Sequence, residues 1–326
     1  MPTRPQVHID RALTNVSVAY MQDASNFIAD KVFPIVPVQK QSDLYFIYRR
    51  EDFLRDEAAE RAVGTESAGG DYSVDLSEPY FCRVYAFHKD VNEQERVNAD
   101  QPLDPDKDST EFVSQKLLIR RERLWAEKFF VAGVWGREVT GKAATPSGDT
   151  ETLQWDQAAS DPVKFVKNES TKMQEGTGYR PNTLVLSPYA KDALLEHPDV
   201  IDRIKYTQKG IASIDLLAQL FEVDKILVAN AIYNSAAKGA RESTGFVMGK
   251  HALLCYSEKN PGIKKPSAGY IFAWKGLKGA GAFGNRIVRI PMPWLGPDTE
   301  RIEGEMAFDM KTIATDLGVF FKDIVA

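Results

Sequence analysis

The sequence predicts an α+β fold with one long helix and many short strands. Residues 109–132 place apolar side chains at helical spacing over about 24 residues, which at 1.5 Å per residue form a rod of roughly 36 Å. The other apolar runs are short and are separated by glycine, proline and polar residues, as is typical of strands. Because strands and helices do not alternate regularly, we exclude a doubly wound parallel sheet.

The composition limits the class of protein. The chain has 326 residues, of which 43% are hydrophobic and 27% charged, so it is not wholly disordered. The net charge is -5 and no long basic block occurs, which argues against a dedicated DNA- or RNA-binding protein. Two cysteines, Cys82 and Cys255, are too few for a disulfide framework and indicate a reducing compartment. No signal peptide and no apolar run of about 18 residues is visible, so we expect no membrane contact.

The first forty residues predict an extended arm. Residues 15–29 are compatible with helix, but Pro34 and Pro37 remove backbone donors and fix φ, so the segment around them cannot be helical. Its apolar side chains must be buried against the rest of the chain or against a neighbouring copy. We assign four of them to an interface between copies: Phe33, Ile35, Val36 and Val38. We also expect that a subunit lacking residues 1–40 folds but assembles poorly.

A densely charged stretch follows the arm. The flanking segments, residues 44–48 and roughly 72–90, are rich in aromatic and β-branched residues and are predicted to be strands. The interpretation is a long hairpin that reaches beyond the body, and the alternative is a solvated surface loop. Its charged side chains are assigned to the same interface between copies, where ion pairs set register: Arg49, Arg50, Glu51, Asp52, Arg55, Asp56 and Glu57.

The long helix and the rest of the chain complete the prediction. Asp108 and Glu111 fit a capping box at the start of the helix, and Gly133 weakens its end. Beyond it, helices are predicted after Asp161 and Ser187. Residues 301–325 alternate apolar and polar side chains in strand fashion, interrupted at Gly318.

Motifs that carry chemistry are scarce. No histidine is paired at metal-ligand spacing, and His251 with Cys255 is interpreted as structural. Residues 279–284 match GxGxxG, but the strand-like residues 285–291 follow where a dinucleotide site needs a helix, so a flexible glycine loop is predicted. We therefore predict no catalytic, cofactor-binding or metal-ligating residue and no enzyme activity. A soluble enzyme whose groups converge from distant positions stays the alternative from another class.

The order of the segments resembles the major capsid proteins of tailed bacteriophages, which have the Hong Kong 97 capsid fold. The resemblance covers nearly the whole chain, beginning with Phe27-Ile28-Ala29-Asp30-Lys31-Val32-Phe33-Pro34. It continues through residues 117–129, 197–204, 216–221, 226–228, 265–270 and 314–318. The resemblance implies an N-arm at 1–43, an E-loop hairpin at 44–90, a P-domain with its spine helix at 91–180, an A-domain at 181–300, and closing strands of the P-domain at 301–326.

The same resemblance implies a function and partners. The expected function is a structural major capsid protein that self-assembles into hexamers and pentamers, forming an icosahedral head around double-stranded DNA. A bacterial encapsulin-type compartment protein shares the fold and is the structural alternative. The implied partners are further copies, a portal protein, a separate scaffolding protein, a possible decoration protein and packaged DNA bound without sequence specificity, with no membrane. The implied location is the virion, after assembly in the host cytoplasm.

Overall fold

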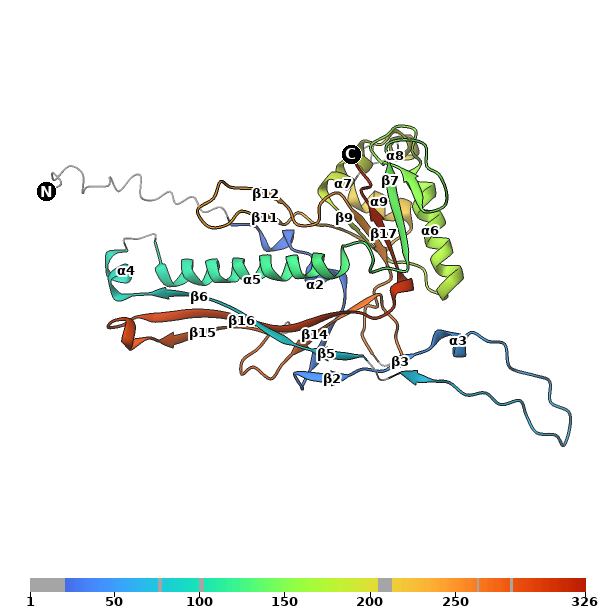
Figure 1. Ribbon diagram of the computed structural model, residues 1–326, viewed down its shortest axis with the longest axis horizontal. Coiled ribbons are helices and arrows are strands. Elements are labelled where there is room, and N and C mark those ends of the chain that lie inside the picture. Colours follow the sequence, from blue (N-terminus) through green and yellow to red (C-terminus); the bar gives the residue numbers. More distant parts are fainter. Residues whose placement is uncertain (1–20, 76–77, 100–102, 205–212, 263, 282–283) are drawn as a thin grey trace.

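The computed structural model describes residues 21–75, 78–99, 103–204, 213–262, 264–281 and 284–326. The molecule is elongated, with a long helix lying along a long sheet, a second sheet with its helices at one end, and a hairpin projecting beyond the body (Figure 1). Of the segment 15–29, interpreted as compatible with helix, residues 15–20 lie outside the described residues, and the rest holds only the 3-10 turn η2 (Ala24–Asn26) and the first residue of α2 (Ala29–Val32). Within those residues, no helix is both long and apolar enough to cross a membrane.

The first sheet has five strands and supports the long helix. Its order is β1-β14-β16-β15, with β6 also paired to β16. The strands are β1 (Ile35–Val38), β6 (Arg83–Val91), β14 (Gly269–Trp274), β15 (Asn285–Pro291) and β16 (Glu300–Thr312). Helix α5 (Pro105–Phe129) lies against β16 and β6. Glycine is required at Gly304, because a Cβ there would lie 2.6 Å from Leu117 Cδ1 and 2.7 Å from Val113 Cγ1.

The long helix starts earlier than the capping box predicts. Asp104 is the N-cap, its carboxylate accepting the Asp106 and Lys107 backbone N–H groups at 3.1 Å each, and Pro105 follows at the first helical position. The predicted cap at Asp108 is therefore wrong, since Ser109 is fully buried inside the helix. Phe129 ends the helix, and the Phe130 N–H still reaches the Ala126 carbonyl at 3.0 Å.

The second sheet forms a separate core with four helices. Its six strands run in the order β10-β9-β13-β17-β7-β8. They are β7 (Arg137–Lys142), β8 (Glu151–Leu153), β9 (Thr183–Leu186), β10 (Lys225–Val228), β13 (Ala252–Cys255) and β17 (Gly318–Lys322). The helices are α6 (Pro162–Thr177), α7 (Pro188–Glu196), α8 (Pro198–Ile204) and α9 (Ile214–Phe221). Trp155 and Phe321 are fully buried at the centre of this core, their rings 5.6 Å apart.

The carboxyl-terminal segment joins the two sheets. β16 lies in the five-stranded sheet, whereas β17 lies between β13 and β7 in the six-stranded sheet, with η4 (Thr315–Leu317) between them. The strands predicted over 301–325, with an interruption at Gly318, are β16 and β17, but they do not both close the sheet beside the long helix, because β17 belongs to the other sheet. Residues 269–291, placed with the A-domain by resemblance, form β14 and β15 beside the long helix.

The hairpin is built from two short strand pairs. β2 (Ser42–Leu44) pairs with β5 (Pro79–Phe81), and β3 (Ile47–Tyr48) pairs with β4 (Val74–Asp75). The predicted continuous strand over 72–90 is thus three strands, of which only β6 enters the large sheet. The remaining elements are η2 (Ala24–Asn26), α2 (Ala29–Val32), α3 (Arg50–Phe53), α4 (Glu93–Asn98), β11 (Ile232–Asn234), β12 (Thr244–Phe246) and η3 (Pro293–Leu295).

Candidate assembly surfaces

The apolar arm is buried in its own subunit. The Phe33 side chain is 2% exposed, with its ring 4.7 Å from Phe129 and 6.0 Å from Trp125. β1 follows and pairs in parallel with β14, so that Ile35, Val36 and Val38 are half-buried against the same chain. The structure contradicts an interface role for Phe33, because a ring enclosed by its own core cannot contact a neighbouring copy. The three residues of β1 keep only their exposed edges for such a contact.

A buried carboxylate fixes the arm to the long helix. Glu122 of α5 is fully buried and accepts the Ala29 N–H at 2.9 Å and the Ile28 N–H at 3.1 Å. These two N–H groups lie at the amino-terminal end of the short helix α2, which has no capping side chain of its own. Burial raises the pKa of Glu122 to about 7, against the lowering effect of the two backbone donors. Sequence reasoning missed Glu122, since nothing in the local pattern marks this carboxylate as the buried one.

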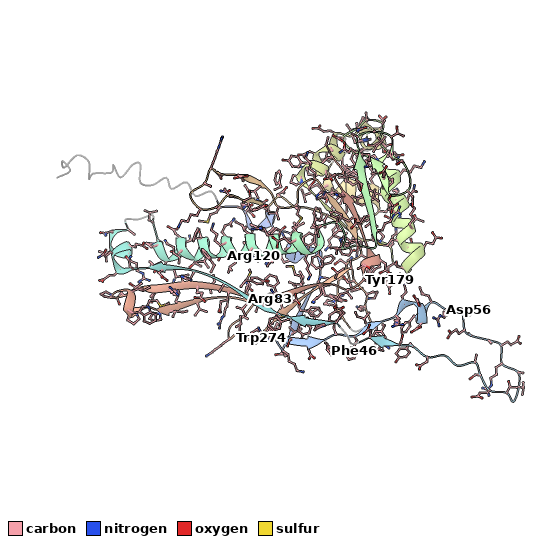
Figure 2. The ribbon with its side chains drawn as sticks, viewed as in Figure 1. Phe46, Asp56, Arg83, Arg120, Tyr179 and Trp274 are labelled. Atoms are coloured by element: carbon pink, nitrogen blue, oxygen red, sulfur yellow. The ribbon has the colours of Figure 1, made fainter. Side chains whose placement is uncertain are left out.

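The charged residues of the hairpin divide into two groups. In the first group, the Arg50 side chain forms an ion pair with Asp316 of η4, which belongs to the body. Asp52 accepts the Ser73 N–H at 2.9 Å, a hydrogen bond from across the hairpin that holds its pKa below the usual range. Arg55 lies 3.8 Å from both Asp52 and Glu57. Arg49, Glu51 and Asp56 are exposed, and Figure 2 shows Asp56 beyond the hairpin base on the projecting limb.

Aromatic rings and one lysine form the base of the hairpin. Tyr48, Phe53 and Tyr72 come from both limbs, with ring centroids 5.6 to 6.1 Å apart. Lys264 reaches them from the body and places its Nζ 5.3 Å from the Tyr48 ring and 5.6 Å from the Tyr72 ring. The backbone of Lys264 is left-handed, with φ at 64°. At this ring cluster the hairpin therefore contacts the body through the exposed side chain of Lys264.

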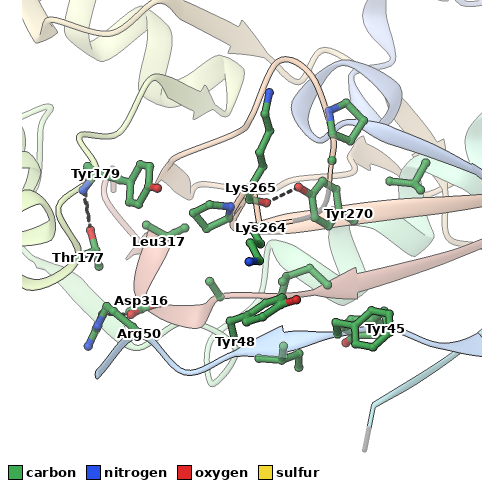
Figure 3. Close-up of a pocket in the computed structure, with 18 of the residues that line it drawn as sticks. Tyr45, Tyr48, Arg50, Thr177, Tyr179, Lys264, Lys265, Tyr270, Asp316 and Leu317 are labelled. Atoms are coloured by element: carbon green, nitrogen blue, oxygen red, sulfur yellow. Dashed lines mark hydrogen bonds and ion pairs between the residues drawn. The ribbon is translucent and has the colours of Figure 1, made fainter. Parts of the chain in front are cut away.

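An open groove of about 1070 Å³ lies between the hairpin base and the body. Figure 3 shows Tyr45 and Tyr48 on the hairpin side, and Tyr179, Lys264 and Tyr270 on the body side. Its walls come from four distant parts of the sequence: residues 36–54, 177–179, 261–272 and 313–317. Phe46 lines the groove and is 59% exposed. Phenylalanine side chains are usually buried, so this exposure is unusual. No sequence pattern could reveal this groove, because it exists only once these segments are folded together.

The two cysteines and His251 have structural roles in the body. Burial raises the pKa of Cys82 and of Cys255 to about 12, so both thiols are protonated at neutral pH. His251 Nδ1 accepts the Asp323 N–H at 2.9 Å and its ring lies against Phe320, in the structural role predicted. Residues after Gly284 form β15, so a strand follows the GxGxxG match, as predicted. The described residues hold no group of three metal-ligating side chains.

One serine–histidine pair resembles a catalytic arrangement. The Oγ of Ser160 and the Nε2 of His197 are 2.9 Å apart. Both groups also hydrogen-bond the Gln157 carbonyl, at 2.8 Å and 3.1 Å. The other ring nitrogen, Nδ1, accepts a hydrogen bond from the backbone N–H of Asp199 at 3.2 Å, whereas in a triad it would carry the proton and donate a hydrogen bond to a carboxylate. The pair ties the start of α8 to the loop before α6.

Comparison with known proteins finds similarity to phage capsid proteins. The model of a family described as phage major capsid protein E matches residues 145–265. The major capsid protein of Burkholderia phage BcepMu is 27% identical over 283 residues, covering 82% of this chain and 84% of that protein. The major capsid protein of Pseudomonas phage JBD67 is 27% identical over 321 residues, covering 98% of this chain and 97% of that protein.

Solved structures share the fold over most of the chain. A phage-related protein from Bordetella bronchiseptica RB50 matches with a TM-score of 0.69 at 23% identity, covering 93% of this chain and 94% of that one. The capsid of cyanophage P-SCSP1u matches with a TM-score of 0.60 at 9% identity, covering 97% and 93%. An encapsulin complex from Synechococcus elongatus matches with a TM-score of 0.57 at 11% identity, covering 97% and 95%.

These likenesses, the two joined sheets and the projecting hairpin define the fold: the chain has the Hong Kong 97-type capsid fold. The matching family model and the two curated relatives are phage major capsid proteins, and their similarity to this chain agrees with the resemblance found in the sequence. Those relatives are structural capsid components and belong to no enzyme family.

Proposed function

We propose that this subunit forms hexamers and pentamers that close into an icosahedral shell around double-stranded DNA. The observation that carries the proposal is the hairpin, which leaves the body with large apolar side chains uncovered. Leu54 is 63% exposed beside Phe46 and Phe53, which are also exposed. Apolar side chains clustered on a projecting segment are stable in solution only when a partner buries them, and copies of the same chain are the partner that a shell supplies.

The two sheets support a division of the subunit into domains. We keep an N-arm at 1–43 and an E-loop hairpin at 44–90 as proposals. The P-domain then comprises α4, α5 and β14 to β16, since these elements share the five-stranded sheet or lie on it. The A-domain comprises the six-stranded sheet with α6 to α9. The carboxyl-terminal segment contributes β16 to one domain and β17 to the other, so it connects the two.

The exposed charges of the hairpin are proposed to pair with a neighbouring copy. Arg49, Glu51 and Asp56 are the candidates, because they are exposed while Asp52, Arg55 and Glu57 already lie near one another. Such pairs add little affinity and instead select one register between copies. Ile35, Val36 and Val38 contribute at most their exposed edges.

The remaining partners follow from the role of a DNA container. A net charge of -5 suits a wall that encloses DNA without gripping it, so packaged DNA is proposed to be held without sequence specificity. A portal protein, a separate scaffolding protein and possible decoration proteins complete the proposal, with assembly in the host cytoplasm. Strong, salt-sensitive DNA binding by the purified subunit would contradict this part.

Electron microscopy of the expressed protein tests the proposal. Closed shells with five-fold and six-fold capsomers are expected, with a scaffolding protein co-expressed if the chain alone does not close. A subunit that stays monomeric under every assembly condition would contradict it. An encapsulin-type compartment shares the fold, and cargo enzyme in place of DNA inside the particle would favour that alternative.

A further inference from the structure

Two uncovered apolar surfaces lie at opposite ends of the subunit. One is the groove at the hairpin base, lined by Phe46. The other is the turn between β15 and β16, where Trp294 is 73% and Leu295 53% exposed. In Figure 1 this turn lies at one end of the long sheet and the hairpin leaves from the other. The two surfaces therefore cannot meet within one subunit.

The turn is a rigid knob, which we define as residues 292–296. The Met292 N–H donates to the Thr299 carbonyl at 2.8 Å, and the Leu295 N–H donates to the Met292 carbonyl at 2.9 Å. Met292 is buried beneath the turn, and Gly296 has a φ of 141°, which a side chain rarely allows. The structure thus presents Trp294 and Leu295 outward on a fixed backbone, so little conformational entropy is lost when a partner covers them.

The groove has the size and chemistry to receive this knob. Its volume of about 1070 Å³ is at the upper end of pockets that enclose drug-sized ligands, roughly 300–1,000 Å³. It offers aromatic rings and the amino group of Lys264, and tryptophan is the aromatic residue that cations bind best. Asp298 is exposed just beyond the knob and carries the opposite charge. Apolar surface and charge are therefore both complementary.

We propose that the knob of one subunit seats in the groove of a second copy, with Trp294 as its anchor. The contact joins two different surfaces, so it generates a ring or a closed shell when successive copies are related by a suitable rotation. Buried tryptophans of this kind dominate interface energy. The inference rests on the proposed shell and adds which surfaces meet.

Cysteine cross-linking tests the contact. The native thiols of Cys82 and Cys255 are buried and do not interfere. In particles of the double variant Phe46→Cys with Leu295→Cys, oxidation is expected to give a ladder of covalent multimers on a non-reducing gel, because a disulfide needs Cα atoms within about 7 Å. Neither single variant is expected to cross-link. The matched control joins Phe46→Cys with Ile201→Cys, an exposed position on α8 outside the groove.

A second measurement covers the case in which the double variant does not assemble. Trp294→Ala removes an exposed ring, so the subunit is expected to fold normally while the concentration needed for assembly rises at least tenfold. Ile201→Ala is the control and leaves that concentration unchanged. An unchanged threshold in Trp294→Ala, shells of the double variant without the ladder, or cross-linking by Leu295→Cys alone overturns the inference. Failure of the wild-type chain to form shells would instead contradict the proposed function.

Discussion

The arm and the hairpin are both extended segments, yet the subunit treats them in opposite ways. Phe33 of the arm lies among Trp125 and Phe129 with almost no exposed surface. Phe46, thirteen residues later in the printed sequence, faces an open groove. The sequence around both is apolar and aromatic, so composition alone does not distinguish a segment of the core from a segment that awaits a partner.

Their polar contacts differ in the same sense. Glu122 holds the arm from a site without solvent, where each hydrogen bond is strengthened by the low local dielectric. The outer part of the hairpin contacts the body through the Arg50–Asp316 ion pair and Lys264, all partly exposed and screened by water. Its return strand is packed on the body, where Tyr80 stacks on Phe272 at 4.6 Å. The difference teaches that the arm belongs to the fold of the subunit, whereas the outer part of the hairpin is weakly held and free to respond to a neighbour.

The largest expected effect is on the arm. Phe33→Ala is expected to lower the free energy of unfolding by about 3–5 kcal/mol, because it leaves a cavity among aromatic rings. Phe46→Ala, its counterpart on the hairpin, should change stability by less than about 0.5 kcal/mol. Denaturant titration of both variants measures the difference. The same burial reverses the expectation that a subunit without residues 1–40 folds, and equal stability of the two variants would remove the distinction between arm and hairpin.

Glu122 should make the stability of the arm depend on pH. Its pKa is raised to about 7 in the folded protein from an ordinary 4.5, so the folded state binds more protons between these values and stability falls as pH rises through about 7. The slope reaches about 1.4 kcal/mol per pH unit at most. Asp30 and Arg121 are the charged groups beside it.

The substitution Glu122→Gln isolates this effect. It is expected to flatten the pH dependence between pH 5 and 8 in thermal or denaturant unfolding, while Glu127→Gln, exposed on the same helix, keeps the wild-type slope. A slope that survives in Glu122→Gln would assign the pH dependence to another group.

Local sequence patterns predicted the helices and strands, but they could not predict contacts between residues far apart in the sequence. The long helix and the hairpin were predicted because their signals, the helical spacing of apolar residues and the residue types of strands, lie in neighbouring residues of the sequence. The helix start was missed because Asp104 with Pro105 caps the chain before the motif at Asp108 does. Glu122 and the groove could not be predicted, since each depends on segments far apart in the sequence.

The hairpin charges should affect assembly more than stability. Replacing Arg49, Arg50 and Arg55 together by Gln is expected to lower the free energy of unfolding by about 1 kcal/mol or less, since exposed pairs contribute little. Shell yield should fall severalfold, because Arg49 no longer pairs with a neighbouring copy and the pairs of Arg50 and Arg55 within the subunit, which position the limb, are lost with it. Light scattering measures assembly. Lys128, Lys238 and Lys278, exposed on the body, provide the control triple, and normal shells from the hairpin variant would show that these arginines take no part.

The smallest expected effect concerns Lys264. Lys264→Gln removes the cation above Tyr48 and Tyr72, which at an exposed site contributes about 0.5–1 kcal/mol. Global stability should hardly change, because this contact lies at the surface and leaves the buried clusters intact. Amide hydrogen exchange should instead accelerate at β3 and β4 alone, where local opening requires little free energy. Lys264→Arg keeps a cation over the rings and should restore protection; if both variants exchange alike, the left-handed backbone at 264, rather than the charge, holds the hairpin base.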